Sequence, residues 1–351
     1  MDVLTVAPAA RLSCLTEAQD LVGPALRSAV DRLPGPVRHI AGYHLGWWDE
    51  HGRPVDGDGG KAIRAALVLL AARAVGGSVT AAVPAAVAVE LVHNFSLLHD
   101  DVMDGDRTRR GRTAAWAAFG SAEAILTGDA MLSLAFSVLS EADAQATSGG
   151  AECPERGLPV LLAAVFELVE GQAQDLAFEK RDDVTLRECL AMASGKTASL
   201  LACACGLGAL FGGGERSRIE LLKRFGRDLG LAFQLVDDLL GIWGDPQLTG
   251  KPAGSDLLHH KKSLPVVAAL MHESAAAEEL ARLYLHRGTL ENDQVARAAE
   301  LVEEAGGRRW AVRETEMRLE AAASHLRAIQ PDPEAAEQLL RLTQLVAQRD
   351  K

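Results

Sequence analysis

Apolar residues recur at three- and four-residue spacings along most of the 351-residue chain, and alternating β-branched stretches are rare. Alanine and leucine, which favour helices, are abundant in these segments. The pattern predicts an all-α fold built as a single-domain helical bundle. Hydrophobic residues make up 48% of the chain, which is enough to bury a sizeable core.

Glycine and proline interrupt the helical pattern, but no linker is long enough to divide the chain into two domains. We therefore expect one domain over residues 1–351, with an N-terminal helical segment over 1–50 and C-terminal helices over 266–351. The most apolar region, residues 65–93, is broken at Arg73, Gly76 and Pro84 before ~18 apolar residues accumulate. It predicts two buried helices and no membrane span. The N-terminus lacks the basic and then apolar pattern of a signal peptide.

The charge and cysteine content narrow the class of protein. A net charge of -12 argues against a general nucleic-acid binder, which needs a basic face. It leaves room for a locally basic site that binds an anionic substrate. The five cysteines form no CxxC pair and are odd in number, which predicts reduced, mostly buried thiols in a cytoplasmic protein.

The stretch "LLHDDVMDGDRTRRGRT", residues 97–113, places a block of acid directly before a block of base. On a helix, His93, Asp100 and Asp104 fall within an arc of about 40°, with Asp101 on the flank. Carboxylates at this spacing repel each other, and a divalent cation relieves the repulsion. Oxygen ligands without a nearby cysteine suit Mg2+ better than zinc. A solvated acidic helix end is the alternative interpretation.

A second aspartate pair, Asp237 and Asp238, lies in "FQLVDDLLGIWGD", 137 residues after Asp100. Phe233 and Gln234 precede the pair by one helical turn. The fifth position of this motif is Gly241. Two aspartate pairs, each following an apolar helical run, favour a metal site over a solvated helix end.

Basic residues near these motifs suggest that the anions are phosphates, because Mg2+ bridges carboxylates to phosphate oxygens. Arginine pairs phosphate oxygens in a forked geometry, and a helix that begins behind glycines adds its positive N-terminus. Gly195 is expected to loosen its helix and let Lys196 and Thr197 point inward. The sequence "SGKT" is not a P-loop, because Leu190 stands where that motif needs glycine. The candidate phosphate-binding residues are Lys61, Arg64, Arg109, Arg110, Lys196, Lys251, Lys261 and Lys262.

Six ordered motifs between about residues 59 and 265 carry a resemblance to a known family. They are "GGKAIR", "VELVHNFSLLHDDVMDGDRTRRG", "GQAQDLAFE", "GKTASLLACACGLGA", "FQLVDDLLGIWGD" and "GKPAGSDLLHHKKSLP". The chain resembles the trans-isoprenyl diphosphate synthases of the polyprenyl synthetase family, and most closely the bacterial geranylgeranyl diphosphate synthases.

The resemblance implies the isoprenoid synthase fold, a helical bundle around a deep central cavity, in a cytoplasmic homodimer. It implies a prenyltransferase that condenses isopentenyl diphosphate head-to-tail with dimethylallyl, geranyl or farnesyl diphosphate. Three Mg2+ ions are expected, and no protein nucleophile is needed.

The resemblance also implies roles for individual residues. Asp100, Asp101, Asp104 and Asp237 would bind or support Mg2+, with Asp238 beside them. Lys61, Arg64, His93 and Arg110 would bind the diphosphate of isopentenyl diphosphate. Arg109, Lys196, Lys251 and Lys261 would bind the allylic diphosphate. Thr197, Phe233 and Gln234 would lie near the reacting carbons.

Phe95 and Ser96 are expected to set the length of the product. In the family, bulk at these positions forms the floor of the chain tunnel, and one aromatic residue beside a small one suits twenty carbons. This predicts geranylgeranyl diphosphate. A farnesyl or longer-chain synthase, a class I terpene cyclase and a non-catalytic subunit remain as alternatives.

The chain departs from the family pattern at four positions, Gly241, Ala65, Thr113 and His260. Gly241 stands where many relatives have aspartate, which puts support of the third metal ion in question. We interpret Asp106, Arg107 and Arg112 as ordinary loop and surface charges.

Overall fold

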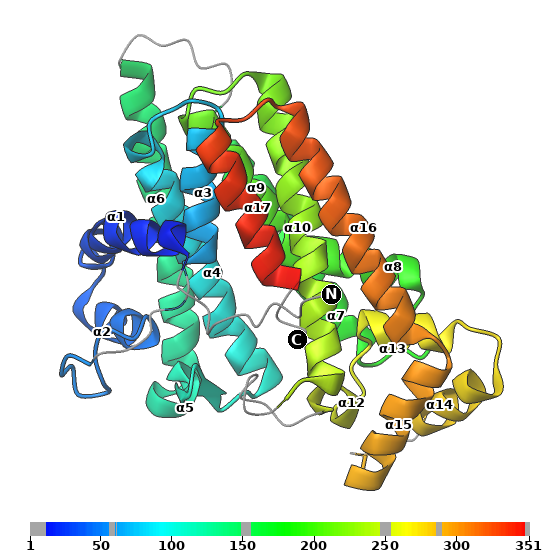
Figure 1. The fold of residues 1–351 in the computed structure, drawn as a ribbon. Helices are drawn as coiled ribbons and strands as arrows, with labels where there is room; N and C mark the ends of the chain where they lie inside the picture. Colours follow the sequence, from blue (N-terminus) through cyan, green and yellow to red (C-terminus); the bar gives the residue numbers. More distant parts are fainter. Residues whose placement is uncertain are drawn as a thin grey trace. The chain divides into compact units, whose positions relative to one another are not determined.

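A computed structural model describes residues 12–55, 60, 62–148, 156–245, 254–285 and 290–347. Its regular structure is helical apart from two strands of two residues each, which confirms the all-α class (Figure 1). The chain forms two compact units. The first comprises Met1–Leu162, Cys203–Glu220 and Pro331–Arg341, and the second Ala163–Ala202, Leu221–Gln330 and Leu342–Lys351. The single domain expected from the sequence stays a prediction.

The first unit is built around α4. The elements up to residue 148 are α1 (Ser13–Val30), α2 (Gly35–His44), α3 (Ile63–Ala74), η1 (Thr80–Ala82), α4 (Val83–Asp104), β1 (Thr108–Arg109), β2 (Arg112–Thr113), α5 (Ala115–Phe119) and α6 (Ser121–Ser148). Helix α4 packs along α6 and also contacts α1 and α3. Fully buried side chains such as Leu67, Leu91 and Met131 fill this core. The apolar region at residues 65–93 thus falls in two helices, α3 and the first half of α4, as the sequence predicts.

The acidic end of α4 is terminated by its own sequence. Gly105 adopts a left-handed conformation with φ 70°, which closes the helix directly after Asp104. A two-stranded hairpin follows, with Arg109 paired to Arg112. Arg110 and Gly111 form its turn with φ 52° and 70°, and two consecutive positive φ angles are typical of a type I′ turn. The hairpin was not expected from the sequence, which predicts only a loop here.

The remaining helices follow in chain order. They are α7 (Gly157–Phe178), α8 (Leu186–Ala193), η2 (Ser194–Ala198), α9 (Ser199–Phe211), α10 (Arg216–Trp243), α12 (Ser255–Leu258), α13 (Leu264–Leu270), α14 (Ala275–Leu285), α15 (Asn292–Glu304), α16 (Gly307–Ala328) and α17 (Pro333–Ala347). In the second unit, α13 packs against α8, α15 and α16. Buried Cys189, Leu235 and Leu264 belong to the core of this unit.

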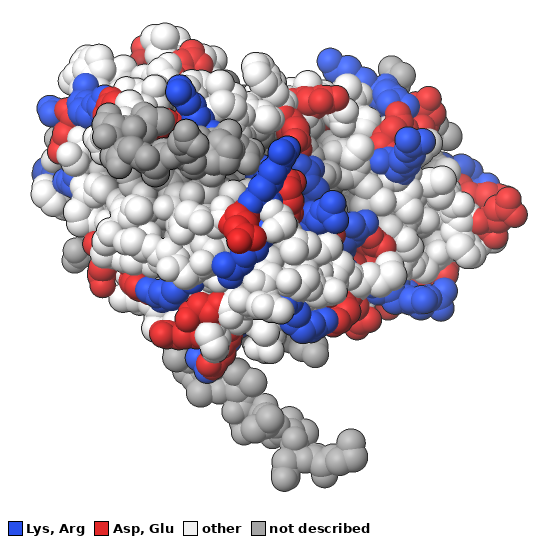
Figure 2. Space-filling view, turned by 90° about the horizontal axis from the view of Figure 1, so that it is seen from above, with Lys and Arg blue, Asp and Glu red and all other residues white. Residues whose placement is uncertain are grey.

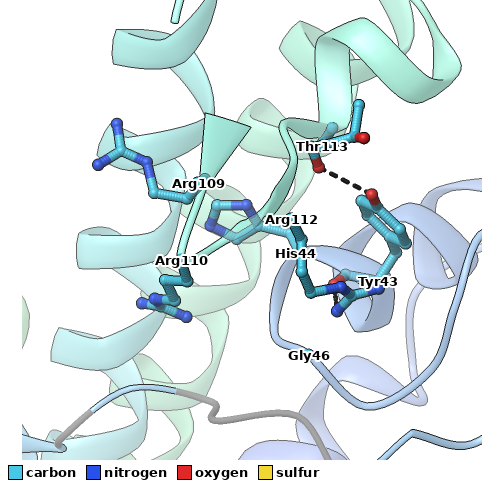
Figure 3. A pocket seen from close by; sticks show the side chains of 8 residues that line it. Tyr43, His44, Gly46, Arg109, Arg110, Arg112 and Thr113 are labelled. Carbon is cyan, nitrogen blue, oxygen red and sulfur yellow. Dashed lines mark hydrogen bonds between the residues drawn. The ribbon is translucent and has the colours of Figure 1, made fainter. Parts of the chain in front are cut away.

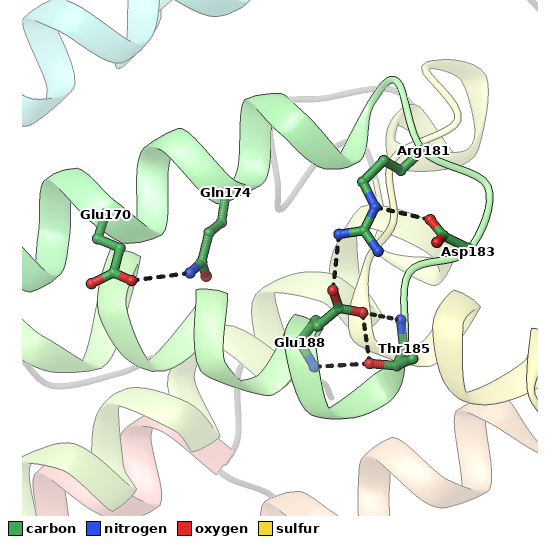
Figure 4. A network of polar contacts seen from close by, with 6 residues as sticks. All are labelled: Glu170, Gln174, Arg181, Asp183, Thr185 and Glu188. Carbon is green, nitrogen blue, oxygen red and sulfur yellow. Dashed lines mark hydrogen bonds and ion pairs between the residues drawn. The ribbon is translucent and has the colours of Figure 1, made fainter.

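Helix α8 begins at a well-formed capping box (Figure 4). The Thr185 hydroxyl accepts from the backbone N–H of Glu188 at 3.3 Å, and the Glu188 carboxylate accepts from the backbone N–H of Thr185 at 2.9 Å. Arg181 donates to the same carboxylate at 2.8 Å. The backbone and hydroxyl donors of Thr185, together with Arg181, lower the pKa of Glu188 to about 2. These contacts fix the start of the helix that leads into η2.

Three helical stretches among the described residues are long and apolar enough to cross a membrane by length and composition alone. They are Thr80–Asp104, Ser121–Gln145 and Leu186–Phe211, whose apolar windows are 61%, 44% and 67% buried. The absence of a membrane span therefore stays a prediction.

The structure shows the charge distribution on one face (Figure 2) and the environment of four cysteines. On the face shown in Figure 2, acidic and basic side chains are interspersed and form no broad basic surface. Cys14, Cys189, Cys203 and Cys205 are buried and free, whereas Cys153 lies outside the described residues.

Candidate functional site

The three aspartates of the first motif have different environments. Asp100 is half-buried and Asp104 is exposed, one turn apart at the end of α4. Asp101 is only 1% exposed, and its Oδ1 accepts hydrogen bonds from Nε of Arg109 at 2.9 Å and from Nη2 of the same guanidinium. Burial raises the pKa of Asp101, and Arg109 opposes this shift. Asp101 thus anchors the hairpin arginine to the helix, whereas Asp100 and Asp104 lie nearer to solvent.

The arginines of the hairpin, Arg109, Arg110 and Arg112, point in different directions and make different contacts (Figure 3). Arg109 and Arg110 point away from Tyr43 in Figure 3, whereas Arg112 lies over the Tyr43 ring with 4.4 Å between the guanidinium carbon and the ring centroid. Arg112 also donates to the carbonyl oxygens of Tyr43 at 3.2 Å and Trp48 at 2.9 Å. The interpretation of Arg112 as a surface charge is therefore wrong, because it ties the hairpin to α2.

His44 lies beside these arginines and was not found by sequence reasoning. It lines a small cavity of about 40 Å³ together with Arg109 and Arg110 (Figure 3). Its side chain is buried, and its Nε2 has no hydrogen-bond partner among the described residues. Burial and the two arginine charges lower the pKa of His44 to about 3, so the ring is neutral at pH 7. The one available sequence signal was the position of His44 at the end of a short helical segment, just before Trp47 and Trp48.

Arg64 and His93 contact each other, as their shared assignment predicts. Nη1 of Arg64 lies 3.2 Å from Nε2 of His93. Arginine has no acceptor, so the histidine nitrogen accepts and is unprotonated. Burial, then the charges of Arg64 and Arg110, hold the pKa of His93 well below its usual value. Nε of Arg64 is buried without a partner among the described residues, which leaves a donor for a bound anion.

A half-buried glutamate, Glu90, supports this basic group. Glu90 accepts from the backbone N–H of Ala65 at 3.0 Å, and its charge interacts with that of Arg64. The sequence contains Glu90 in the quoted motif, but nothing in its spacing showed this role. Two predicted phosphate ligands, Lys61 and Lys251, lie outside the described residues.

The two residues expected to set product length lie one turn before the aspartates. Phe95 is 6% exposed, and its ring meets that of His99 edge-on with centroids 4.8 Å apart. His99 in turn makes a 3.0 Å hydrogen bond with the carbonyl of Ile125 in α6. Ser96 is half-buried, and its hydroxyl donates to the carbonyl of His93 at 2.9 Å.

A continuous chain of hydrogen bonds links the predicted site residues of the second unit. The Thr197 hydroxyl donates to Oε1 of Gln234 at 2.5 Å, and Nε2 of Gln234 donates to Oδ1 of Asp238 at 2.7 Å. Oδ2 of Asp238 accepts from the backbone N–H of Leu264 at 2.9 Å. Burial raises the pKa of Asp238 to about 7. Asp237 is exposed on the same helix, and Phe233 is half-buried one turn earlier.

Lys196 and Thr197 lie in a π-helical turn, η2, which interrupts the helix. Lys196 donates to Oδ2 of Asp175 in α7 at 2.5 Å. A Cβ atom at Gly195 would lie 2.7 Å from the carbonyl oxygen of Glu167, and one at Gly171 would overlap the backbone of Lys196. The two glycines thus allow α7 and η2 to approach closely. This close approach explains why position 195 requires glycine.

Lys261 lies among carboxylates. Its Nζ is 3.8 Å from Oδ2 of Asp256. Burial lowers the pKa of Lys261, but Asp256, Asp238 and Asp175 raise it more strongly, so the ammonium is charged at pH 7. Sequence reasoning missed Asp175 and Asp256, although both stand inside quoted motifs.

A few carboxylates of the two motifs are reached by solvent, which suits Mg2+. The described residues contain no group of three His, Cys, Asp or Glu side chains that could hold a metal by themselves. Mg2+ in phosphate-transfer sites uses one or two carboxylates and completes its shell with water and substrate phosphates. Asp100 and Asp104 in one unit and Asp237 in the other, all reached by solvent, fit such a role.

Comparison with known proteins gives consistent matches. The family model described as Polyprenyl synthetase matches residues 49–302. A (2E,6E)-farnesyl diphosphate synthase from Mycobacterium tuberculosis is 49% identical over 330 residues, covering 93% of this chain and 90% of the relative. A geranylgeranyl diphosphate synthase from the same organism is 46% identical over 337 residues, covering 96% and 93%.

Solved structures agree in fold. A polyprenyl synthetase from Streptomyces coelicolor is 46% identical with a TM-score of 0.88, covering 95% of this chain and 98% of the other. A geranylgeranyl pyrophosphate synthase from Corynebacterium glutamicum, solved with isoprenyl diphosphate and magnesium, is 25% identical with a TM-score of 0.81 and covers 97% and 100%.

Proposed function

The chain belongs to the polyprenyl synthetase family, and within this family we propose that it is a Mg2+-dependent synthase of geranylgeranyl diphosphate. It would condense isopentenyl diphosphate head-to-tail with dimethylallyl, geranyl and farnesyl diphosphates. The observation that carries the proposal is the first site: Asp100 and Asp104 end α4 beside a hairpin arginine held by Asp101.

The residues of the first unit would bind and orient diphosphate. Arg64 keeps a buried donor without a partner, and Arg110 adds a second cation close to it. Neutral His93 accepts from Arg64 and so holds the guanidinium in place. Asp101 holds Arg109 in the same way. These contacts pre-organise the cations before substrate arrives, which reduces the reorganisation needed in the transition state.

Mg2+, when bound, would stabilise the negative charge that develops on the leaving diphosphate. Asp100, Asp104 and Asp237 would hold three ions, a number that rests on the family resemblance. Lys196 and Lys261 would add positive charge to the allylic diphosphate. Thr197 and Gln234 are held in fixed orientations by the chain that ends at Asp238, and Phe233 adds an apolar surface. Apolar walls would keep water from the allylic cation.

Product length is proposed from Phe95 and Ser96. The buried Phe95 ring is a single aromatic residue beside a small side chain, which favours twenty carbons over fifteen. The two M. tuberculosis relatives reported above are named for different products, so farnesyl diphosphate is the second candidate.

The test is an incubation of purified protein with Mg2+, isopentenyl diphosphate and each allylic diphosphate, followed by dephosphorylation and chromatography. The expected product is the twenty-carbon alcohol. Ser96→Phe should shift it to fifteen carbons, whereas Ser96→Ala should leave it unchanged. A wild-type product of fifteen carbons would overturn the assignment of chain length. Diphosphate release without isopentenyl diphosphate would indicate a cyclase, and no turnover would indicate a non-catalytic subunit.

A homodimer is also proposed. Ile125 and Leu126 on α6 are 41% and 61% exposed, and Phe166 and Val169 on α7 are 73% and 48% exposed. Exposed apolar side chains grouped on a helix are typical of an interface. Sedimentation should give a dimer, and Leu126→Glu should yield monomers. A monomeric wild type at micromolar concentration would contradict the proposal.

We further propose that the protein acts in the cytoplasm without a membrane span, because its apolar helices bury much of their apolar windows within the protein. Fractionation of expressing cells should then recover the protein in the supernatant without detergent. Recovery only in detergent extracts would contradict this.

A further inference from the structure

The second unit contains a cavity that includes none of the predicted catalytic or diphosphate-binding residues. Its volume is about 420 Å³, which lies within the range of small-molecule sites. The first three turns of α16 form one side, and the start of α8, α13 and the α15–α16 junction form the rest. The lining residues are Leu186, Ala268, His272, Ala305, Gly306, Arg309, Trp310, Arg313, Glu314 and Met317.

Two arginines line this cavity without a counter-charge. Arg309 and Arg313 are one helical turn apart on α16 and both are exposed. Within the part of the chain that the structure describes, neither forms a hydrogen bond or an ion pair with another residue. By contrast, Arg318 on the same helix donates to Glu314 at 2.8 Å and to Asp228 at 3.1 Å. The one carboxylate in the lining, Glu314, is thus already bound by Arg318.

The N-terminus of α16 adds positive potential to the same place. Gly306 is the N-cap and lines the cavity, and the first turn contains no acidic residue. Instead it contains Arg308 and Arg309. Cations at a helix N-terminus are unfavourable, and anions there are favourable. Arg308 is balanced by Glu303 at 3.3 Å, but Arg309 is not balanced by any described residue.

The other part of the lining is apolar. Trp310 packs partly against the core formed around Cys189 and Leu235, and Leu186 contacts the same core. Met317 is 59% exposed and follows Arg309 and Arg313 at the next i+4 position, on the same face of α16. A cationic end and an apolar strip therefore adjoin along one helix. A ligand with an anionic head and an apolar chain matches this arrangement.

We propose that this cavity is a binding site for an organic phosphate or diphosphate, with its head on Arg309, Arg313 and the N-terminus of α16. The apolar chain of the ligand lies along Trp310 and Met317. The lining contains none of the motif aspartates, so occupancy of the cavity does not require metal. The assignment goes beyond the proposed catalytic function and does not depend on it.

The test follows Trp310 directly by fluorine NMR of protein labelled with 5-fluorotryptophan, in EDTA. The chain has five tryptophans, and Trp310→Phe identifies the resonance of interest. Decyl phosphate, kept below its micelle concentration, is compared with inorganic phosphate and with decanol. Trp116, which donates to the carbonyl of Asp106 near the hairpin, reports binding at the first site in the same spectra.

The Trp310 resonance should shift with decyl phosphate at a half-saturating concentration at least about tenfold below that of either fragment. Arg309→Gln/Arg313→Gln should raise this concentration about tenfold or more, because two charge-assisted contacts are lost. The control Arg308→Gln/Arg327→Gln removes equal charge from the same helix. It should change the half-saturating concentration of decyl phosphate by less than about twofold. Both arginines of the test variant are exposed, and Arg313→Gln alone serves if the double variant fails to fold.

Three results would overturn the proposal. The first is an unmoved Trp310 resonance up to the solubility limit of decyl phosphate. The second is an equal response in Arg309→Gln/Arg313→Gln and wild type. The third is binding of inorganic phosphate or of decanol as tight as that of decyl phosphate, since the cavity would then be a plain anion site or a plain apolar site.

Discussion

The carboxylate of Asp256 lies directly against the α-carbon of Gly241, so a methyl group added at position 241 would overlap it. Gly241 holds the fifth position of the second aspartate motif. Asp256 comes from a separate segment and lies 3.8 Å from Nζ of Lys261. The space beside Gly241 is thus already occupied by a carboxylate from elsewhere in the second unit.

This contact predicts that an aspartate at position 241 destabilises the protein. Gly241→Asp should lower the free energy of unfolding in EDTA by roughly 1–3 kcal/mol, because a second carboxylate is forced against the first. Asp256→Asn in the same chain should recover part of this loss. Denaturant unfolding of both single variants and the double variant measures the coupling. Additive effects would show that the two side chains do not meet.

The environments of Asp101 and Asp104 predict different stability effects. Asp101→Asn should cost about 3 kcal/mol of unfolding free energy, because it leaves Arg109 without its buried partner. Asp104→Asn, at an exposed position, should change stability by less than about 0.5 kcal/mol. Both should reduce prenyl transfer. Urea unfolding in EDTA provides the comparison, and equal stability losses would refute the assigned anchoring role of Asp101.

His44 predicts a pH dependence of stability. Its folded pKa of about 3 lies below the ordinary 6.5, so the unfolded chain binds the extra proton between these values. The contribution of His44 is therefore complete above pH 6.5 and is lost as pH falls towards 3, by up to roughly 5 kcal/mol.

The variant His44→Gln should flatten the slope of unfolding free energy against pH in that window. His51→Gln, which removes an exposed histidine, is the matched control. Chemical denaturation from pH 4 to 7 measures it. Parallel profiles for His44→Gln and wild type would contradict the prediction.

Gly195 predicts the effect of a single methyl group. Gly195→Ala should destabilise the protein by about 1–3 kcal/mol, because the new Cβ atom would lie 2.7 Å from the carbonyl of Glu167. It should also weaken the pair between Lys196 and Asp175. Thermal unfolding measures this loss, and a neutral Gly195→Ala would refute the close approach.

The helical class was predictable because it depends on local periodicity. The apolar spacing in residues 65–93 directly reflects α3 and α4, and the break at Pro333 reflects the start of α17. The hairpin at Arg109–Arg112 was not predictable in the same way. Its turn uses a left-handed arginine before Gly111, which is weaker as a signal than Asn-Gly.

The site was predictable in its members more than in their contacts. The motifs identify Thr197, Gln234 and Asp238 as site residues. The hydrogen bonds that join them depend on packing between distant segments of the chain. Arg112 was interpreted as a surface charge although it has a structural role. Its carbonyl acceptors lie 64 to 69 residues earlier in the chain. Sequence spacing carries no information on such partners.

The π turn at Ser194–Ala198 also affects how this chain is aligned with its relatives. A turn of this kind holds one residue more than an α turn, and each residue advances the helix by about 100°. Removal of a single residue between Ser194 and Ala198 would therefore restore an α turn and leave the later positions of α9 facing the same way. An alignment gap placed there marks the loss of the π turn, whereas a gap in the regular part of α9 would rotate every later position.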